Sequence, residues 1–252
     1  MNIEFLTFVK REIYRFFVLY KQTIVPALIS SLLYIVVFGT TLGSRISSIN
    51  GIPYINYIVP GLAMMSVINQ AYQNSASSIM QAKYLKFIED LLIAPLSGLE
   101  ISLGYIIGGA LRGLICGLGI LIICLFLTDL TIDNFILTFF YLLTVSWTFS
   151  AFGVIIGIYA KTWDEIGSFT NFVFMPMTFL GGVFYSLDML PPFWRNVSYF
   201  NPIYWMISGL RYSTLGLEEN SNYISLIICF CFSCTFTAIA AYLFKTGYKI
   251  KS

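Results

Sequence analysis

The sequence contains no histidine and few charged residues, and both absences narrow what this protein can do. Charged residues make up 10% of the 252 positions, whereas 58% are hydrophobic and the mean hydropathy is +0.82. A soluble domain has about 25% charged residues, so this composition indicates an integral membrane protein. The net charge of +2 gives no reason to expect nucleic acid as a partner. Without histidine, the commonest general base and a common metal ligand are missing.

Motifs for nucleotide binding and catalysis are missing as well. The phosphate-binding pattern GxxxxGK[ST] does not occur, and no nucleophile, base or pair of carboxylates converges by spacing. An energy source must therefore be another chain or an ion gradient. We predict no catalytic site, no bound cofactor and no metal site in this chain. The five cysteines lie in apolar runs and are expected to be small buried hydrophobic residues; they are Cys116, Cys124, Cys229, Cys231 and Cys234.

Long apolar runs fill most of the chain. A helix that crosses a bilayer needs about 20 mostly apolar residues, and six runs approach or exceed this length. We predict an all-α membrane protein with six transmembrane helices and a single transmembrane domain over residues 1–252. The predicted spans cover residues 23–42, 57–80, 101–127, 135–160, 168–185 and 223–244.

The segment before the first span mixes charged residues with aromatic rings. It lacks the compact apolar core and the cleavage site of a signal peptide. Its apolar residues recur at helical spacing from Phe5 to Phe17, and Lys10, Arg11, Glu12 and Arg15 interrupt them. This pattern predicts an amphipathic helix at the membrane surface. The alternative is a polar beginning of the first span.

Lysine and arginine are distributed unequally between the two sides of the membrane. Of 14, ten lie in one set of tails and loops, three lie in the opposite set, and Arg112 lies inside a span. Since cytoplasmic loops carry the excess of these residues, both termini are predicted to be cytoplasmic. The ten are Lys10, Arg11, Arg15, Lys21, Lys83, Lys86, Lys161, Lys245, Lys249 and Lys251; the three are Arg45, Arg195 and Arg211.

The predicted external loop between spans five and six contains the sequence LPPFWRNVSYFNPIYW, residues 190–205. Pro191 and Pro192 can begin a short helix, because proline is tolerated in a first turn. Asn201 can cap a second helix over residues 203–214. Two short helices predict a re-entrant hairpin, which requires protein cover or a cavity at membrane depth. An aromatic-rich loop resting on the membrane is the alternative.

A second unusual segment, residues 81–95, lies in the predicted cytoplasmic loop between spans two and three. Its charged residues flank an apolar face, and a proline ends the predicted helix. Such a short amphipathic helix either docks into a groove of a partner protein or connects two spans along the bilayer surface. The residues concerned are Lys83, Lys86, Glu89, Asp90, Leu92 and Pro95.

Polar residues recur every three or four positions along the second span. Amides are costly in lipid, so this stripe must face protein or water and either lines a pathway or joins helices across an interface. In the glycine-rich third span, close helix packing is expected. Arg112 lies in the same span and needs an acidic partner, backbone carbonyls or a hydrated cavity. The candidate pathway or interface residues are Asn69, Gln70, Gln73, Asn74 and Arg112.

Several stretches resemble a known family. They are FGTTLGSR (38–45), YIVPGLAMMSVINQAY (57–72), IEDLLIAPLS (88–97), YAKTWDEIG (159–167) and FLGGVFYSLDMLPPFWRNVSYFNPIYWMISGLRYSTLG (179–216). The chain resembles the type-2 class of ABC exporter permeases, and within it the YadH-like inner-membrane transport permeases. The resemblance implies a six-span subunit that works as a pair with two separate ATPase subunits, which bind ATP and magnesium.

The same resemblance implies roles for three segments. The N-terminal helix would lie at the cytoplasmic interface, and residues 81–95 would form a coupling helix on the ATPase, with Glu89 and Pro95 in characteristic positions. The hairpin would be a lid over the external end of the path. The candidate lid residues are Pro191, Pro192, Trp194, Asn201, Pro202 and Arg211.

We therefore predict the membrane subunit of an ATP-driven exporter in the bacterial inner membrane, where it contacts lipid and forms the path as a homodimer. The chain by itself would not be an enzyme. One alternative is a gradient-driven carrier or channel, although the predicted spans contain none of the carboxylates that ion coupling usually needs. Another is a membrane anchor for an ATPase that transports nothing. The substrate is not evident from the sequence.

Overall fold

The computed structural model describes residues 3–219 and 221–247, apart from the side chain of Leu92. Lys249 and Lys251, used in the prediction of orientation, lie outside the described residues. The elements, in chain order, are α1 (Ile3–Val18), α2 (Tyr20–Thr41), β1 (Ser48–Ile49), β2 (Ile52–Pro53), α3 (Tyr54–Tyr84), α4 (Phe87–Ile93), α5 (Gly98–Leu127), α6 (Phe135–Tyr159), α7 (Trp163–Phe169), the π-helix η1 (Thr170–Phe174), α8 (Met175–Leu180), the 3₁₀-helix η2 (Leu187–Met189), α9 (Pro192–Tyr199), α10 (Pro202–Leu215) and α11 (Asn222–Thr246).

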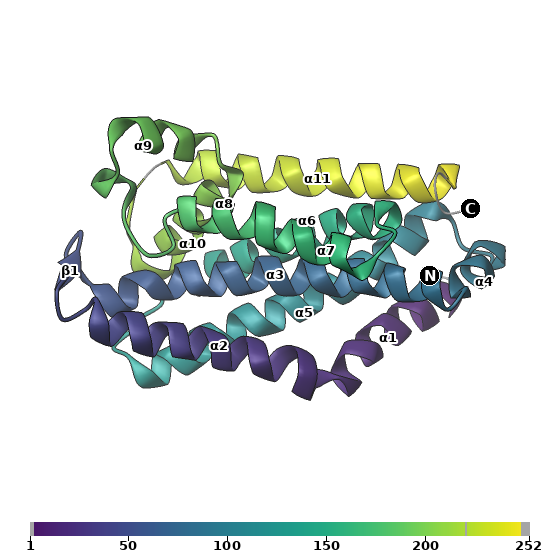
Figure 1. Cartoon of the computed structure of the whole chain (residues 1–252), viewed down its shortest axis with the longest axis horizontal. Helices are drawn as coiled ribbons and strands as arrows, with labels where there is room; N and C mark the ends of the chain where they lie inside the picture. The colour runs from purple at the N-terminus through teal and green to yellow at the C-terminus, as the bar shows by residue number, and fades with distance from the viewer. Residues whose placement is uncertain (1–2, 220, 248–252) are drawn as a thin grey trace.

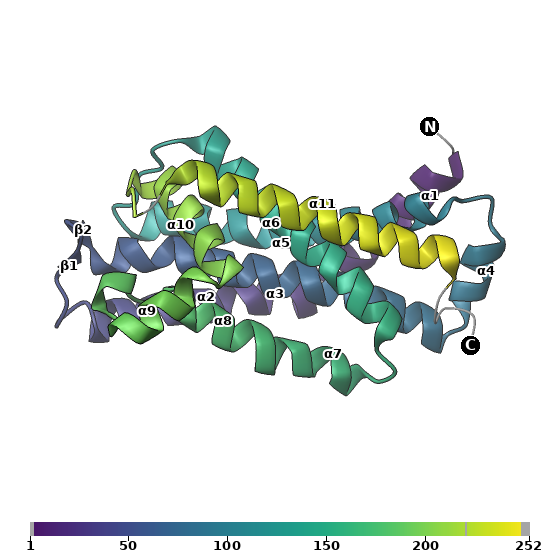
Figure 2. The same cartoon turned by 90° about the horizontal axis from the view of Figure 1, so that it is seen from above.

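Helix α3 forms the centre of a bundle of long helices, as Figures 1 and 2 show. It packs most extensively against α5 and α6, and most of its side chains are buried. Small residues permit this close packing. A Cβ added at Gly113 of α5 would lie 2.9 Å from the Ala71 side chain and 3.0 Å from the Val67 carbonyl oxygen. The predicted packing role of the glycines in the third span is therefore confirmed.

Four helices among the described residues are long and apolar enough to cross a membrane: α2, α5, α6 and α11. They correspond to the first, third, fourth and sixth predicted spans. Helix α3 is longer, with 31 residues, but its polar stripe lowers its hydropathy. The predicted fifth span consists of three consecutive helical pieces, α7, η1 and α8.

The predicted boundaries of that fifth span, residues 168–185, are wrong. The helical pieces begin at Trp163, where the Thr162 hydroxyl accepts from the backbone N–H of Glu165 at 3.3 Å, and they end at Leu180. The chain then turns through Gly182, whose φ of +77° is accessible to glycine without steric cost. The long apolar run did not reveal this turn because the residues that follow it are also largely apolar.

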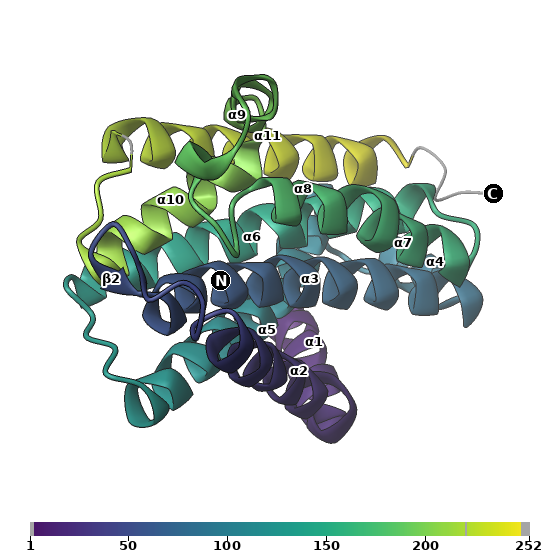
Figure 3. The same ribbon diagram turned by 60° about the vertical axis from the view of Figure 1, so that its left-hand side comes forward.

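The two ends of the bundle carry different short elements. Helix α4, the beginning of α1 and the end of α11 lie at one end, whereas the β1–β2 pairing, α9 and α10 lie toward the other (Figures 1 and 2). Helix α1 departs from the bundle at an angle to α2 and contacts α5 (Figure 3). Its buried face packs the Phe8 ring edge-on against Tyr105 at 5.0 Å, and Tyr105 stacks on Phe244 of α11.

The prediction of two short helices after the fifth span is confirmed by α9 and α10. The Asn201 side chain accepts from the backbone N–H of Ile203 at 3.0 Å, so the predicted helix cap is present.

The expected single helix over residues 81–95 is wrong, because α3 continues to Tyr84. Lys86 then adopts a left-handed conformation, with φ of +61°, and α4 begins after it.

Candidate functional site

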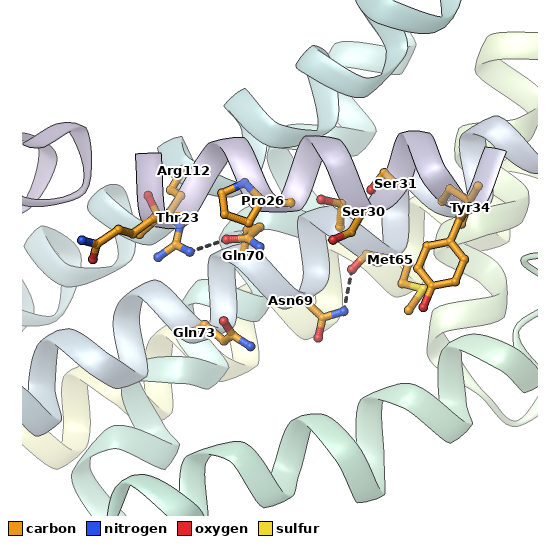
Figure 4. Close-up of a pocket in the computed structure, with 14 residues that line it drawn as sticks. Thr23, Pro26, Ser30, Ser31, Tyr34, Met65, Asn69, Gln70, Gln73 and Arg112 are labelled. Carbon is orange, nitrogen blue, oxygen red and sulfur yellow. Dashed lines mark hydrogen bonds between the residues drawn. The ribbon is translucent and has the colours of Figure 1, made fainter. Parts of the chain in front are cut away.

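The polar stripe of α3 lies beside a groove between α2 and α3. Asn69, Gln70 and Gln73 line this groove and are partly exposed, whereas Asn74 is buried. Figure 4 shows Gln70 directed toward α2 and toward Arg112 of α5, with Asn69 and Gln73 on the same helix α3. The groove has a volume of about 310 Å³, which is at the lower end for small-molecule sites. Four of the five candidate pathway residues thus meet at one cavity.

Arg112 is held by amide oxygens and not by a carboxylate. Its side chain is 7% exposed, and its guanidinium donates to Gln70 Oε1 and, at 3.5 Å, to Asn74 Oδ1. No carboxylate among the described residues forms an ion pair with it. The sequence predicted acidic groups, backbone carbonyls or a hydrated cavity as possible partners. The structure provides a cavity, together with the side-chain amides of the α3 stripe.

A buried ion-pair network connects α1 to the same stripe. Glu12 is 1% exposed and accepts from the Ser78 hydroxyl at 2.5 Å and from Arg11 at 3.1 Å. The Arg15 Nε atom lies 3.6 Å from the Glu12 carboxylate, and the Arg15 NH2 group donates to the Asn74 backbone and side-chain oxygens. Burial lowers the pKa of Arg15, and the Glu12 carboxylate opposes that shift. Helix α1 is therefore attached to α3 by polar contacts as well as by packing.

The sequence predicted Glu12 only as one of the charged residues that interrupt the apolar residues of α1. Glu12 nevertheless lies four residues from both Phe8 and Phe16, which are the other buried residues of this helix. Residues four apart share one face of a helix. A carboxylate on the apolar face predicts a buried partner, and the two nearby arginines could have supplied it.

The candidate coupling residues lie at the end of the bundle that holds α4. Lys86, Glu89, Asp90 and Pro95 are exposed, and so are apolar neighbours such as Ile93, which is 84% exposed. Ile88 and Leu91 face inward. Helix α4 thus presents both acidic and apolar side chains at its surface. Leu92 was predicted to contribute to this site, but its side chain lies outside the described part of the structure.

Lys83 differs from the other candidate coupling residues because it points into the bundle. Its Nζ donates to the carbonyl oxygens of Gly157, Ile158 and Ala160, at 3.2, 2.7 and 2.8 Å. These carbonyls are at the end of α6, where a helix has unpaired acceptors and a partial negative charge. Lys83 therefore caps α6, a role that the sequence did not indicate.

The candidate lid residues divide into exposed and buried groups. Pro191, Pro192 and Trp194 are exposed on α9 and just before it, and the exposed ion pair between Arg195 and Asp188 at 2.7 Å holds α9 near η2. Asn201 is buried, and its amide donates to the Met177 carbonyl oxygen of α8 at 2.6 Å. Pro202 begins α10 and is partly buried.

Arg211 is the most enclosed of these residues, at 1% exposed. It forms a buried ion pair with Glu219 at 2.9 Å and donates to the Gly182 carbonyl oxygen at 2.8 Å. Its guanidinium lies over the Tyr57 ring at 3.9 Å, and the Tyr57 hydroxyl donates to Glu219 at 2.6 Å. This cluster joins α10, the turn after α8 and the start of α3. The sequence missed Glu219 as the partner of Arg211.

The predicted site residues therefore occupy three separate places along the bundle: the α4 end, the α2–α3 groove and the α9–α10 end. The described residues contain no group of histidine, cysteine, aspartate and glutamate side chains arranged to hold a metal. The arrangement offers surfaces, a cavity and fixed charges. These features are suited to binding and to conformational change.

Comparisons with known proteins agree with one another. A family model described as ABC-2 type transporter matches residues 3–215. The chain is 41% identical over 242 residues to the inner membrane transport permease YadH of Escherichia coli K12, covering 96% of this chain and 94% of the relative. The same values apply to the permease of that name from Shigella flexneri. Nodulation protein J of Neorhizobium galegae is 21% identical over 207 residues, covering 80% and 79% of the two chains.

Proposed function

The chain belongs to the ABC-2 type transporter family, and from that premise we propose that it is the transmembrane subunit of an ATP-driven exporter. The membership makes it a membrane transport subunit of an ABC system, with an ABC ATPase as its partner and no enzymatic activity indicated for the chain itself. It is a multi-pass protein of the inner membrane. The observation that carries the proposal is the match over residues 3–215, which includes every candidate site.

The proposed topology has six spans: α2, α3, α5, α6, the α7–η1–α8 segment and α11. Helix α3 extends about 46 Å, longer than the ~30 Å hydrocarbon core, and its polar stripe is in part buried against neighbouring helices and in part lines the α2–α3 groove. The α7–η1–α8 segment extends only about 27 Å, slightly less than the thickness of the core. The α4 end is cytoplasmic, with both termini, and α9 and α10 form an external re-entrant lid. The asymmetry in lysine and arginine supports this orientation.

Helix α4 is the proposed contact with the ATPase, which binds ATP and magnesium. Its exposed acidic and apolar residues support this role, because an amphipathic helix with unpartnered side chains suits a groove in another protein. Two copies of the chain would form the path through an isologous interface, in which each contributes the same surface. The α2–α3 groove would then face the path, and the lid would close its external end.

Co-purification tests the partnership directly. The tagged chain, co-expressed with its candidate ATPase and extracted in mild detergent, is expected to yield a stoichiometric complex with a P-loop ATPase by mass spectrometry. ATP hydrolysis by that complex should depend on the chain. If no ATPase is recovered in several detergents, the exporter proposal fails and a gradient-driven carrier becomes the better hypothesis.

Substitution of Glu89 tests the coupling surface. Because Glu89 is exposed on α4, Glu89→Ala should leave the melting temperature almost unchanged, as is usual for a surface site. We expect chain-stimulated ATP hydrolysis to fall about tenfold, which corresponds to ~1.4 kcal/mol of lost interaction. Glu218→Ala, an exposed glutamate at the opposite end of the bundle, is the matched control. Unchanged hydrolysis and transport by the Glu89 variant would count against α4 as the coupling element.

A further inference from the structure

The groove between α2 and α3 contains a buried positive charge that no acidic residue of the described chain neutralises. Arg112 is 7% exposed and is hydrogen-bonded by Gln70 and Asn74. Amide oxygens are neutral acceptors, whereas arginine stays protonated in proteins. The charge therefore has hydrogen-bond partners but no counter-ion among the described residues.

The acidic residue of the adjoining network is already engaged. Glu12 interacts with Arg11, Arg15 and Ser78. Asn74 Oδ1 accepts from Arg15 at 3.1 Å and from Arg112 at 3.5 Å, so one neutral oxygen lies between two guanidinium groups. The network thus sets one carboxylate against three arginines, and this excess positive charge favours an additional anion.

Three buried polar atoms without partners belong to residues that line the same groove. Arg112 Nε, Ser66 Oγ and Asn69 Oδ1 have no hydrogen-bond partner among the described residues, and all three residues line the cavity. Ser66 is 8% exposed. An unsatisfied buried polar atom costs about 1–3 kcal/mol, and a polar ligand in the cavity would reduce this cost. Two of the three, the guanidinium nitrogen and the hydroxyl, can donate to an anionic oxygen.

Part of the lining is apolar, although polar side chains are more numerous, and the groove is accessible. Pro26, Ala27, Leu62 and Met65 form apolar wall beside the polar residues, and exposed positions such as Ser30 lie at its opening. Figure 4 shows Pro26, Ser30 and Met65 along the same groove as Arg112. Arg112 is 14 residues into α5, about 21 Å along a helix of about 45 Å. A ligand at this depth must satisfy both a buried charge and an apolar surrounding.

We propose that the α2–α3 groove binds the anionic head group, a phosphate or carboxylate, of an amphiphile, with Arg112 as its counter-ion. Ser66 donates a second hydrogen bond, and the apolar wall accommodates the beginning of the hydrocarbon chain. The amphiphile is either a bilayer lipid or the transported substrate. The second source rests on the proposed transport function, whereas binding itself does not.

Binding of dodecyl phosphate to the full-length chain in phosphatidylcholine nanodiscs tests this site. We expect the wild-type chain to bind dodecyl phosphate at least about tenfold more tightly than uncharged dodecyl glucoside, as measured by titration and native mass spectrometry. Arg112→Gln should remove most of this preference, since a charge-assisted contact worth ~1.4 kcal/mol accounts for a factor of ten. Arg45→Gln, at an exposed arginine, should retain it.

A second variant keeps the test decisive if Arg112→Gln does not fold. Ser30→Phe adds a ring at the opening of the groove and leaves Arg112 in place, so it should also abolish the preference. Equal binding of dodecyl phosphate and dodecyl glucoside to the wild-type chain would overturn the proposal, provided that added phosphatidylglycerol is also not retained. Equal binding of dodecyl phosphate by the wild-type, Arg112→Gln and Ser30→Phe chains would overturn it too.

Nanodiscs that also contain phosphatidylglycerol separate the two sources. A resident lipid site predicts that phosphatidylglycerol stays bound to the wild-type chain, but not to Arg112→Gln, and blocks dodecyl phosphate. A substrate site predicts that phosphatidylglycerol has no effect and that dodecyl phosphate still binds. Neither measurement uses the ATPase. A chain that co-purifies with an ATPase but shows no anion preference would refute the groove proposal alone.

Discussion

Glu219→Ala is expected to destabilise the protein by about 3–5 kcal/mol, the usual effect of removing one partner from a buried ion pair. The substitution leaves the Arg211 guanidinium, which is 1% exposed, with the Gly182 carbonyl and the Tyr57 ring as its remaining contacts. Thermal melting of the purified chain in detergent, followed by tryptophan fluorescence, measures the loss. Because the cluster joins α10 to the start of α3, we also expect faster proteolysis near α9 and α10.

Two further variants identify the cause. Glu218→Ala removes an exposed neighbouring carboxylate and should change stability by less than about 0.5 kcal/mol. The double variant Arg211→Met, Glu219→Leu removes both charges and should be more stable than Glu219→Ala alone, since the main cost is an unpaired buried charge. If the double variant is as unstable as the single one, packing and not charge explains the effect.

Glu12→Ala is expected to have the next largest effect, about 2–4 kcal/mol, because it removes the carboxylate that accompanies Arg15 in the buried network. It also leaves the Ser78 hydroxyl without its acceptor. We expect α1 to loosen from α3 and α5. Hydrogen exchange should then increase in α1 more than in α6, and the melting temperature should fall.

Glu4→Ala is the matched control, since Glu4 is an exposed glutamate of the same helix. It should leave both hydrogen exchange in α1 and the melting temperature close to the wild-type values. Equal effects of the two variants would mean that α1 is held by its general charge or helicity and not by the buried contacts of Glu12.

Much of the helical framework could be predicted from the sequence. The apolar runs located α2, α5, α6 and α11, and the asparagine at position 201 located the start of α10. These features depend on neighbouring residues: periodicity, run length and a side chain that caps its own helix. The end of α8 was misplaced although Gly181 and Gly182 are a usual signal for the end of a helix. The break between α3 and α4 was missed because a left-handed lysine, Lys86, carries no distinct sequence pattern.

The candidate site was predicted only in part. The stripe of α3 and Arg112 were identified as residues that must avoid lipid, and they do meet at one groove. Lys83 was placed on the partner-facing surface, yet it caps α6 through contacts 74 to 77 residues away. The coupling roles of Glu89 and Pro95 remain predictions, because a surface residue has no internal contact that reveals what covers it.

The sequence by itself determined that this is a helical membrane protein, because composition and the length of apolar runs need no knowledge of contacts. Only the tertiary structure decided how its buried charges are arranged: Glu12 with Ser78, Arg211 with Glu219, and Arg112 with side-chain amides. The physical reason is that burying a charge is tolerable only with suitable partners. Helical periodicity specifies the face on which a residue lies, but not which distant side chain will meet it there.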